Sequence, residues 1–174
     1  MSQTLLLMRH AKSAHGDSSL SDHARPLNER GRRDSVRIAR WLSEHQLVPD
    51  RILASDSQRT LETAARMNGT WPNAVEISSC ESLYLASPES ILWTIAESNA
   101  KAERLLVLGH NPGTSSVASF LAQSSIQMPT AAVAVFSVTS GAGEESQSPL
   151  DRLGRDSACE LRSYVTPKSI ATVD

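Results

Sequence analysis

Two arginines and two histidines stand where apolar segments of the sequence end. Arg9 and His10 follow the apolar residues 4–8, Arg59 comes shortly after the segment RILAS, and His110 closes the segment RLLVLGH. A guanidinium presents forked N–H donors that match the oxygens of a phosphate group. An imidazole beside it is a nucleophile that can accept a phosphoryl group and form phosphohistidine. These residue types predict phosphoryl-transfer chemistry if the fold brings them together.

A second imidazole would have a distinct role in such a site. It can donate a hydrogen bond to the phosphate oxygens as negative charge develops on them. The two arginines already supply positive charge, so we expect neither a metal ion nor an organic cofactor. Taken singly, each residue has a simpler explanation. An arginine at the end of a strand is usually solvated, and a lone histidine there is more often structural than catalytic.

The rest of the sequence alternates between two kinds of segment. Short apolar runs predict strands, and apolar residues at helical spacing predict helices. Ser87-Pro88 is typical of a helix start, and Asp56 or Ser57 is expected to cap the helix that runs to about residue 67. The expected strands are residues 4–8, 51–55, 74–78, 104–110, 131–139 and 159–166; the expected helices lie within 29–45, 57–67, 87–99 and 111–123; the expected loops are 11–28 and 141–155.

This alternation predicts one α/β domain over residues 1–174, a three-layer α/β/α sandwich around a mostly parallel sheet. In such sheets, ligands bind beyond the carboxyl ends of the strands. If the first, second and fourth strands are neighbours, Arg9, His10, Arg59 and His110 meet in one crevice.

Composition excludes several other classes of protein. The chain of 174 residues is 40% hydrophobic and 21% charged, which is ordinary for a globular domain. Its net charge of −2 predicts no general attraction to nucleic acid or to an anionic membrane. No apolar run has the length of a membrane span, and the first residues do not have the pattern of a signal peptide. Cys80 and Cys159 lack metal-binding spacing, and they fit a cytoplasmic location.

Five motifs occur in a fixed order: LLLMRHAKS, RPLNERG, ILASDSQRTLETA, ESLY and LLVLGHNPG. With them the sequence resembles the histidine phosphatase superfamily, and most of all its SixA-type phosphohistidine phosphatase branch, over about residues 4–120. The resemblance implies a phosphoglycerate mutase-like fold and hydrolase activity. It implies that His10 is the nucleophile, that Arg9 and Arg59 hold the phosphate, and that His110 is the second histidine of the site.

Two positions depart from the commoner pattern of this family. Ala11 stands where many members have glycine, but the RHAKS form resembles a variant of the SixA-type branch, so activity is still expected. Asp56 stands where proline is common, and we expect its carboxylate to cap the following helix. Arg25, in the RPL motif, is expected to be an additional contact, either to the phosphate or at the rim of the site.

Glu81 has two interpretations of equal weight. Many members of the family use a carboxylic acid in this region to protonate the leaving group, and Glu81 follows the third expected strand. Alternatively, it is a solvated loop residue. Whether the enzyme needs such an acid depends on the substrate. An alkoxide needs a proton to leave, whereas imidazole leaves readily because its conjugate acid has a pKa of roughly 6.5.

The length of the chain between Glu81 and Arg104 indicates the class of substrate. There is room for one helix and not for the insertion that covers the pocket in sugar-phosphate members of the family. An open site favours a phosphohistidine on a protein, such as a phosphotransfer domain. Two alternatives stay open: a phosphatase for a small phosphate ester or anhydride, for which Glu81 would be needed, and an inactive phosphate-binding module.

The loop of residues 11–28 suggests one competing site. It contains two histidines and two aspartates that could in principle bind a metal ion: His15, His23, Asp17 and Asp22. Such residues in a polar loop are commonly solvated, and no metal is expected.

Overall fold

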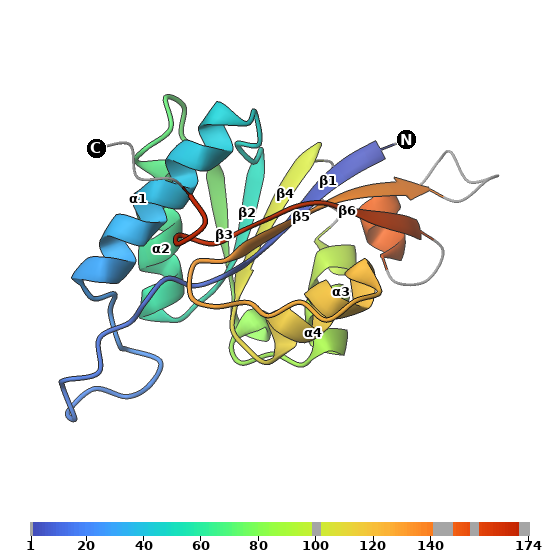
Figure 1. Ribbon diagram of the computed structural model, residues 1–174. Coiled ribbons are helices and arrows are strands. Elements are labelled where there is room, and N and C mark those ends of the chain that lie inside the picture. Colours follow the sequence, from blue (N-terminus) through green and yellow to red (C-terminus); the bar gives the residue numbers. More distant parts are fainter. Residues whose placement is uncertain (1, 99–101, 141–147, 154–156, 171–174) are drawn as a thin grey trace.

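A single mixed sheet with helices on both faces forms the centre of the molecule (Figure 1). The computed structural model describes residues 2–98, 102–140, 148–153 and 157–170. The sheet has six strands in the order β3-β2-β4-β1-β5-β6. They are β1 (Ser2–Arg9), β2 (Arg51–Ser55), β3 (Glu76–Cys80), β4 (Arg104–Gly109), β5 (Val133–Ser140) and β6 (Ser157–Val165).

The sheet is mostly parallel, as the sequence predicts. The strands β1, β2, β3 and β4 pair in parallel, whereas β5 is antiparallel to both β1 and β6. The third strand is shifted by two residues from the expected 74–78, because its pairing with β2 continues to Cys80. The arrangement places β1 beside β4 and β4 beside β2, which is the condition for a shared crevice.

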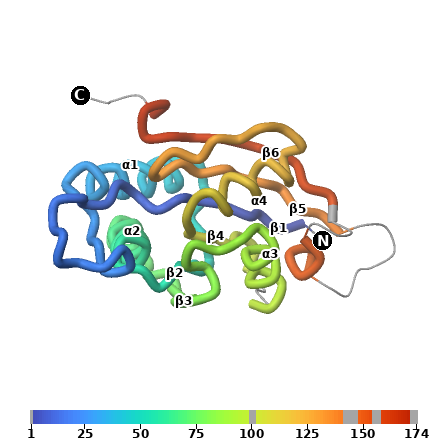
Figure 2. The backbone as a smooth tube through the Cα atoms, turned by 90° about the horizontal axis from the view of Figure 1, so that it is seen from below, coloured from blue at the N-terminus to red at the C-terminus, as the bar shows by residue number. Residues whose placement is uncertain are grey.

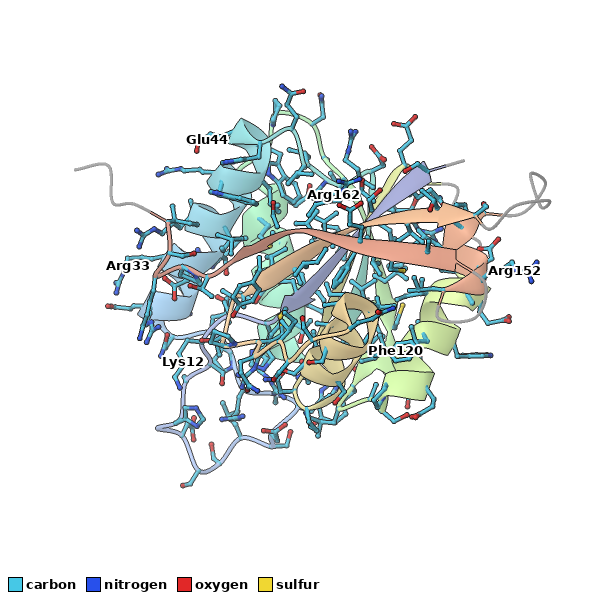
Figure 3. All side chains as sticks on the ribbon, turned by 45° about the vertical axis from the view of Figure 1, so that its right-hand side comes forward. Lys12, Arg33, Glu44, Phe120, Arg152 and Arg162 are labelled. Carbon is cyan, nitrogen blue, oxygen red and sulfur yellow. The ribbon has the colours of Figure 1, made fainter. Side chains whose placement is uncertain are left out.

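In the part of the chain that the structure describes, four α-helices cover the two faces of the sheet, so the three-layer prediction is confirmed. The helices α1 (Glu29–Glu44) and α2 (Gln58–Asn68) pack on one face, and α3 (Pro88–Glu97) and α4 (Gly113–Ala122) on the other. Charged residues such as Arg33 and Glu44 project from the outer side of α1 (Figure 3). Within the described residues, no helix has the length and apolar character needed to cross a membrane.

The apolar run of β1 packs into two cores at once. Leu5 and Leu7 face α3 and α4, and Leu6 and Met8 face α1 and α2, with all four side chains fully buried. Because successive residues of a strand point to opposite faces, a central strand covered on both sides needs an unbroken apolar sequence. This packing fixes the end of β1, and therefore the position of the residues that follow it.

The helix starts agree only in part with the sequence pattern. The Ser87 hydroxyl accepts a hydrogen bond from the Ser90 amide at 3.2 Å, as expected of the cap of α3. The expected cap at Asp56 is wrong. Ser57 occupies the N-cap position of α2 without a side-chain capping bond, and the Asp56 carboxylate lies 3.0 Å from Nε2 of His23.

Residues 11–28 run beyond the carboxyl edge of the sheet as a long loop, as predicted. Its two limbs are tied together by one antiparallel bridge between Ser13 and Leu27. Figure 2 shows the molecule from this end, with β1, β4 and β2 in the middle. The expected loop 141–155 contains a short 3-10 helix, η2 (Pro149–Arg152), while residues 141–147 and 154–156 lie outside the described residues.

Candidate active site

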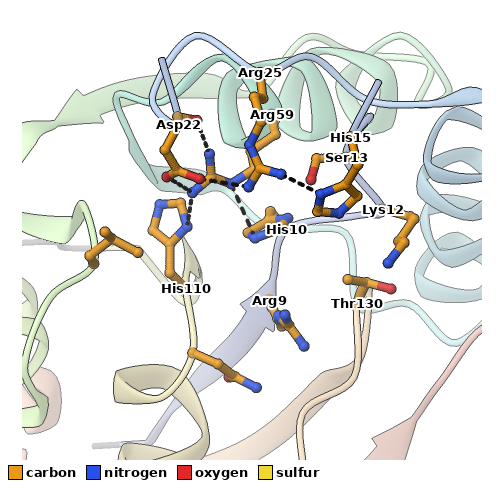
Figure 4. Close-up of a pocket in the computed structure, with 12 residues that line it drawn as sticks. Arg9, His10, Lys12, Ser13, His15, Asp22, Arg25, Arg59, His110 and Thr130 are labelled. Atoms are coloured by element: carbon orange, nitrogen blue, oxygen red, sulfur yellow. Dashed lines mark hydrogen bonds and ion pairs between the residues drawn. The ribbon is translucent and has the colours of Figure 1, made fainter. Parts of the chain in front are cut away.

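The ends of β1, β4 and β2 bring the four predicted residues into one cavity (Figure 4). The His10 amide donates to the Gly109 carbonyl at 3.1 Å, which holds the end of β1 against the end of β4. Arg59 lies in the first turn of α2, which begins just past β2. The cavity has a volume of about 280 Å³ and is lined by Arg9, His10, Lys12, Ser13, His15, Asp22, Arg25, Arg59, Leu85, His110, Asn111 and Thr130.

His10 is held in one tautomer by a backbone carbonyl. Its Nδ1 lies 2.7 Å from the Ala11 carbonyl oxygen, and since a carbonyl can only accept, Nδ1 carries the proton. The other nitrogen, Nε2, accepts a hydrogen bond of 3.3 Å from Nε of Arg59. Burial lowers the pKa of His10 to about 4, with Arg59 and Arg9 acting in the same direction and the bond to Ala11 acting against it. His10 is therefore a neutral imidazole with its lone pair on Nε2 at neutral pH.

Arg59 joins the two histidines. Its side chain is almost fully buried, its Nε contacts His10, and its Nη2 lies 3.2 Å from Nδ1 of His110. The two imidazole rings lie 5.1 Å apart, centre to centre. One guanidinium thus touches both imidazoles, so the fold places these three predicted residues in direct contact.

His110 is held in the opposite tautomer. Because a guanidinium only donates, Nδ1 of His110 accepts from Arg59, and Nε2 donates to the Ser55 hydroxyl at 2.8 Å. Burial lowers the pKa of His110 to about 3, and the neighbouring His10 and Arg59 lower it further. In this tautomer, Nδ1 of His110, the nitrogen that faces Arg59, carries no proton. To donate a hydrogen bond to phosphate from Nδ1, His110 must become protonated, and the negative charge of a bound phosphate favours the protonated form.

Arg9 supplies the second guanidinium. Its Nη1 donates to the Met128 carbonyl at 3.2 Å, and its Nε is buried without a hydrogen-bond partner among the described residues. Burial and the neighbouring Arg59 lower the pKa of Arg9. Two like charges facing one cavity repel each other, so the site favours an anion between them.

Asp22 and Tyr84 complete the site, and sequence reasoning missed both roles. The Asp22 carboxylate accepts from Nη2 of Arg59 at 3.0 Å and from the Tyr84 hydroxyl at 2.8 Å. The Tyr84 ring meets the His110 ring edge-on at 5.4 Å. The hydrogen bond from Tyr84, opposed by partial burial and helped by Arg59, lowers the pKa of Asp22 to about 2. The ESLY motif was the available signal for Tyr84.

Arg25 lies at the rim of the cavity, as the sequence predicts. Its Nη2 donates to Oδ1 of Asp22 at 2.6 Å, and its Nη1 donates to Nδ1 of His15 at 2.8 Å. The guanidinium is mostly covered by these neighbours, yet it still lines the cavity. A phosphorylated group that enters the cavity would meet this third arginine.

Comparison with known proteins identifies the family. The sequence model of the histidine phosphatase superfamily (branch 1) matches residues 5–83. The chain belongs to this superfamily. An uncharacterized chloroplastic protein of Arabidopsis thaliana is 31% identical over 97% of this chain and 80% of its own length. An uncharacterized protein of Mycobacterium tuberculosis strain H37Rv is 38% identical over 73% of this chain and 76% of its own length.

Two solved structures share the fold. A protein from Nakamurella multipartitia, provisionally assigned as the phosphohistidine phosphatase SixA, matches with a TM-score of 0.80 and 24% identity, over 96% of this chain and 97% of that one. The protein histidine phosphatase SixA in complex with tungstate matches with a TM-score of 0.75 and 20% identity, over 97% of this chain and 100% of that one.

The departures from the common histidine phosphatase pattern are accommodated locally. Ala11 is fully buried and is not among the described residues with positive φ, so alanine replaces glycine there without backbone strain. Its amide donates to the Thr63 hydroxyl at 3.1 Å, which ties the segment after His10 to α2. Asp56 does not line the cavity, so its carboxylate is not a competitor for phosphate.

Glu81 is the one predicted site residue that the fold does not bring into the cavity. It begins the short 3-10 helix η1 (Glu81–Leu83), its side chain is exposed, and it is absent from the lining. Its assignment as the acid that protonates the leaving group stays a prediction.

The loop residues that could suggest a metal site have other partners. His15 contacts Arg25, His23 contacts Asp56, and Asp17 accepts hydrogen bonds from Ser19. In the described parts of the chain, no three His, Cys, Asp or Glu side chains gather as a set of metal ligands.

Proposed function

We propose that this protein is a metal-independent phosphatase that hydrolyses phosphohistidine on another protein, such as a phosphotransfer domain, through a phosphohistidine formed on His10. The observation that carries the proposal is the state of His10. Its Nδ1 proton is committed to the Ala11 carbonyl, so the lone pair is on Nε2, which accepts the N–H of Arg59 and gives up that hydrogen bond when it attacks phosphorus. A neutral imidazole fixed in this way is a nucleophile that needs no base.

The reaction proceeds in two steps. In the first, Nε2 of His10 attacks the phosphorus, the P–N bond of the substrate breaks, and its electron pair leaves with the substrate imidazole, which takes a proton from water. In the second, water attacks the phosphorus on His10, its proton passes to solvent, and phosphate leaves as the bond to Nε2 breaks. Arg9 and Arg59 offset the charge on the transferring group throughout.

Two features favour phosphohistidine as the substrate. The chain between η1 and β4 holds the helix α3 and no large insertion, which leaves the cavity accessible to a side chain of another protein. The exposed position of Glu81 outside the cavity favours a leaving group that needs little protonation. The names of the two SixA structures described above support the same substrate class. The cytoplasmic location stays a prediction, and one relative is itself named as chloroplastic.

The covalent intermediate provides the test. Wild-type protein is mixed briefly with a ³²P-labelled phosphohistidine protein and quenched in alkali, and label is expected on His10. The variant His10→Ala should retain its fold by circular dichroism and carry no label. The matched control is His45→Ala, which removes an exposed histidine at the end of α1. Turnover of phosphohistidine by His10→Ala at a rate near that of the wild type would overturn the proposal.

A further inference from the structure

Leu85 is the one apolar side chain among the described residues that line the cavity. The other lining residues are charged or polar, and they include the three arginines and three histidines described above. Leu85 is 55% exposed, so it contributes little to the core of the protein. An exposed leucine at the mouth of a cationic cavity has no evident role in folding.

The backbone at Leu85 makes a leucine there more unusual. Its φ is 45°, in the left-handed region where a Cβ crowds the neighbouring carbonyl and where glycine or asparagine is favoured. A residue held in a sparsely populated conformation persists only where its surroundings impose it, and such residues cluster at ligand-binding sites. The fold would therefore accept glycine at this position more readily than leucine.

Both neighbours of Leu85 are fixed. The Tyr84 hydroxyl is bonded to Asp22, and its ring packs edge-on against His110. On the other side, the Ala86 carbonyl lies against Gly113, where an added Cβ would come within 2.1 Å of that oxygen. Leu85 is thus held between two anchored residues, and its side chain is presented at the cavity from a rigid segment.

We propose that Leu85 determines specificity by packing against the ring of the leaving group, which is the imidazole if the proposed phosphohistidine substrate is correct. The arginines recognise the phosphate oxygens, which are the same in every phosphorylated substrate. The arginines therefore cannot distinguish one leaving group from another. The flat face of an aromatic ring gains by contact with an apolar side chain, because both surfaces leave water. A polyhydroxylated leaving group would lose hydrogen bonds to water against the same leucine without replacing them.

The test compares leaving groups with and without a ring. The substrates are a phosphohistidine peptide, 4-nitrophenyl phosphate and acetyl phosphate, of which only the last lacks a ring. The variants are Leu85→Gly, Leu85→Asn and Leu85→Met. Glycine and asparagine suit the left-handed backbone but remove the apolar surface, whereas methionine keeps it. The matched control is Gln123→Gly, because Gln123 also has a left-handed φ, 51°, but caps α4 and does not line the cavity.

We expect Leu85→Gly and Leu85→Asn to lower kcat/KM for the two ring substrates about tenfold more than for acetyl phosphate, as is typical when a pocket loses an apolar contact. The loss should appear mainly in KM. Leu85→Met should stay close to wild type, and Gln123→Gly should leave the ratio between substrates unchanged. The thermal midpoint of Leu85→Gly should equal or exceed that of the wild type.

The outcomes that overturn the inference differ from the one that contradicts the proposed function. Equal losses of kcat/KM on all three substrates, or no loss on any, would show that Leu85 does not discriminate between leaving groups. A lower thermal midpoint with equal losses would assign Leu85 a structural role. Absence of phosphohistidine turnover by the wild type would contradict the proposed function alone, because the ratio between 4-nitrophenyl phosphate and acetyl phosphate still tests Leu85.

Discussion

Asp22 accepts hydrogen bonds from both terminal nitrogens of Arg59. Nη1 donates to its backbone carbonyl at 2.6 Å, and Nη2 donates to its carboxylate at 3.0 Å. These are nitrogens of the same guanidinium whose Nε contacts His10. A phosphate that approaches His10 must therefore compete with an internal carboxylate for Arg59, or share the guanidinium with it. The negative charge of Asp22 opposes the binding of the substrate anion.

The variant Asp22→Asn tests this competition. It removes the charge but keeps the backbone carbonyl and an oxygen that can accept from Tyr84, so the loop should hold its place. We expect the inhibition constant of orthovanadate to fall by roughly fivefold, on the scale of one partly exposed charge interaction. The control is Asp17→Asn in the same loop, which contacts Ser19 and does not line the cavity. Weaker inhibition in Asp22→Asn would instead mean that Asp22 positions Arg59.

The elements that position the site follow from short patterns in the sequence. The apolar run of β1 and the end of β4 at His110 are visible because a strand buried on both faces must be apolar throughout. The strand β3 is displaced because it lies at the edge of the sheet, where Ser78 and Ser79 can continue the pairing without an apolar signal. Motif order adds the roles of Arg9 and Arg59.

The contacts of Asp22 could not be predicted in the same way. Asp22 and Tyr84 are 62 residues apart and lie in a loop and beside a 3-10 helix, for which no periodic pattern exists. The same holds for Asp56, where propensity indicated a cap but the nearby His23 takes the carboxylate. At such positions a tertiary contact overrides the local conformational preference of the residue, and the sequence does not reveal that contact.

Arg59→Lys should damage catalysis despite the conserved charge. An ammonium group is a point charge that cannot contact His10, His110 and a phosphate oxygen at once, as the planar guanidinium can. We expect kcat to fall by about 10²- to 10³-fold, as when one group that stabilises developing charge is removed. Steady-state kinetics checks this, with Arg66→Lys as the control, since Arg66 is on the same helix and its guanidinium bonds to Glu62, away from the cavity. A loss below tenfold would argue against a bidentate role.

The pH dependence should reveal the lowered pKa of His10. Neutral His10 is the reactive form, so kcat/KM should fall only as the pH falls through about 4, the pKa in the free protein. An ordinary imidazole would lose activity near a pKa of roughly 6.5. The profile is measured with 4-nitrophenyl phosphate, whose own ionisation is titrated separately and subtracted. An acid limb centred near 6.5 would mean that His10 is not held neutral by burial and by the arginines.

Chelation should leave activity intact. Arg9 and Arg59 provide the positive charge that a metal ion supplies in other phosphatases, so the proposed mechanism has no step for a divalent ion. Protein dialysed against EDTA is expected to keep its kcat for phosphohistidine. Loss of activity that is restored by a divalent cation would contradict the proposal, and the same experiment on His15→Ala and His23→Ala would show whether the loop holds the ion.

Glu81→Gln separates the two interpretations of that carboxyl. Imidazole is a leaving group that depends little on general acid catalysis, and Glu81 lies outside the cavity lining. Phosphohistidine turnover by Glu81→Gln should therefore change by less than about twofold. The second arm uses a phosphoserine peptide, whose alkoxide leaving group depends on a donated proton. A loss of about tenfold or more on the serine ester alone would assign Glu81 as the acid for esters, since general acid catalysis is worth at least that much. A comparable loss on phosphohistidine would contradict the leaving-group argument, because it would mean that departure of the imidazole also requires a carboxylic acid. Both rates are measured on one preparation across a range of pH, with Glu97→Gln, at the end of α3, as the control.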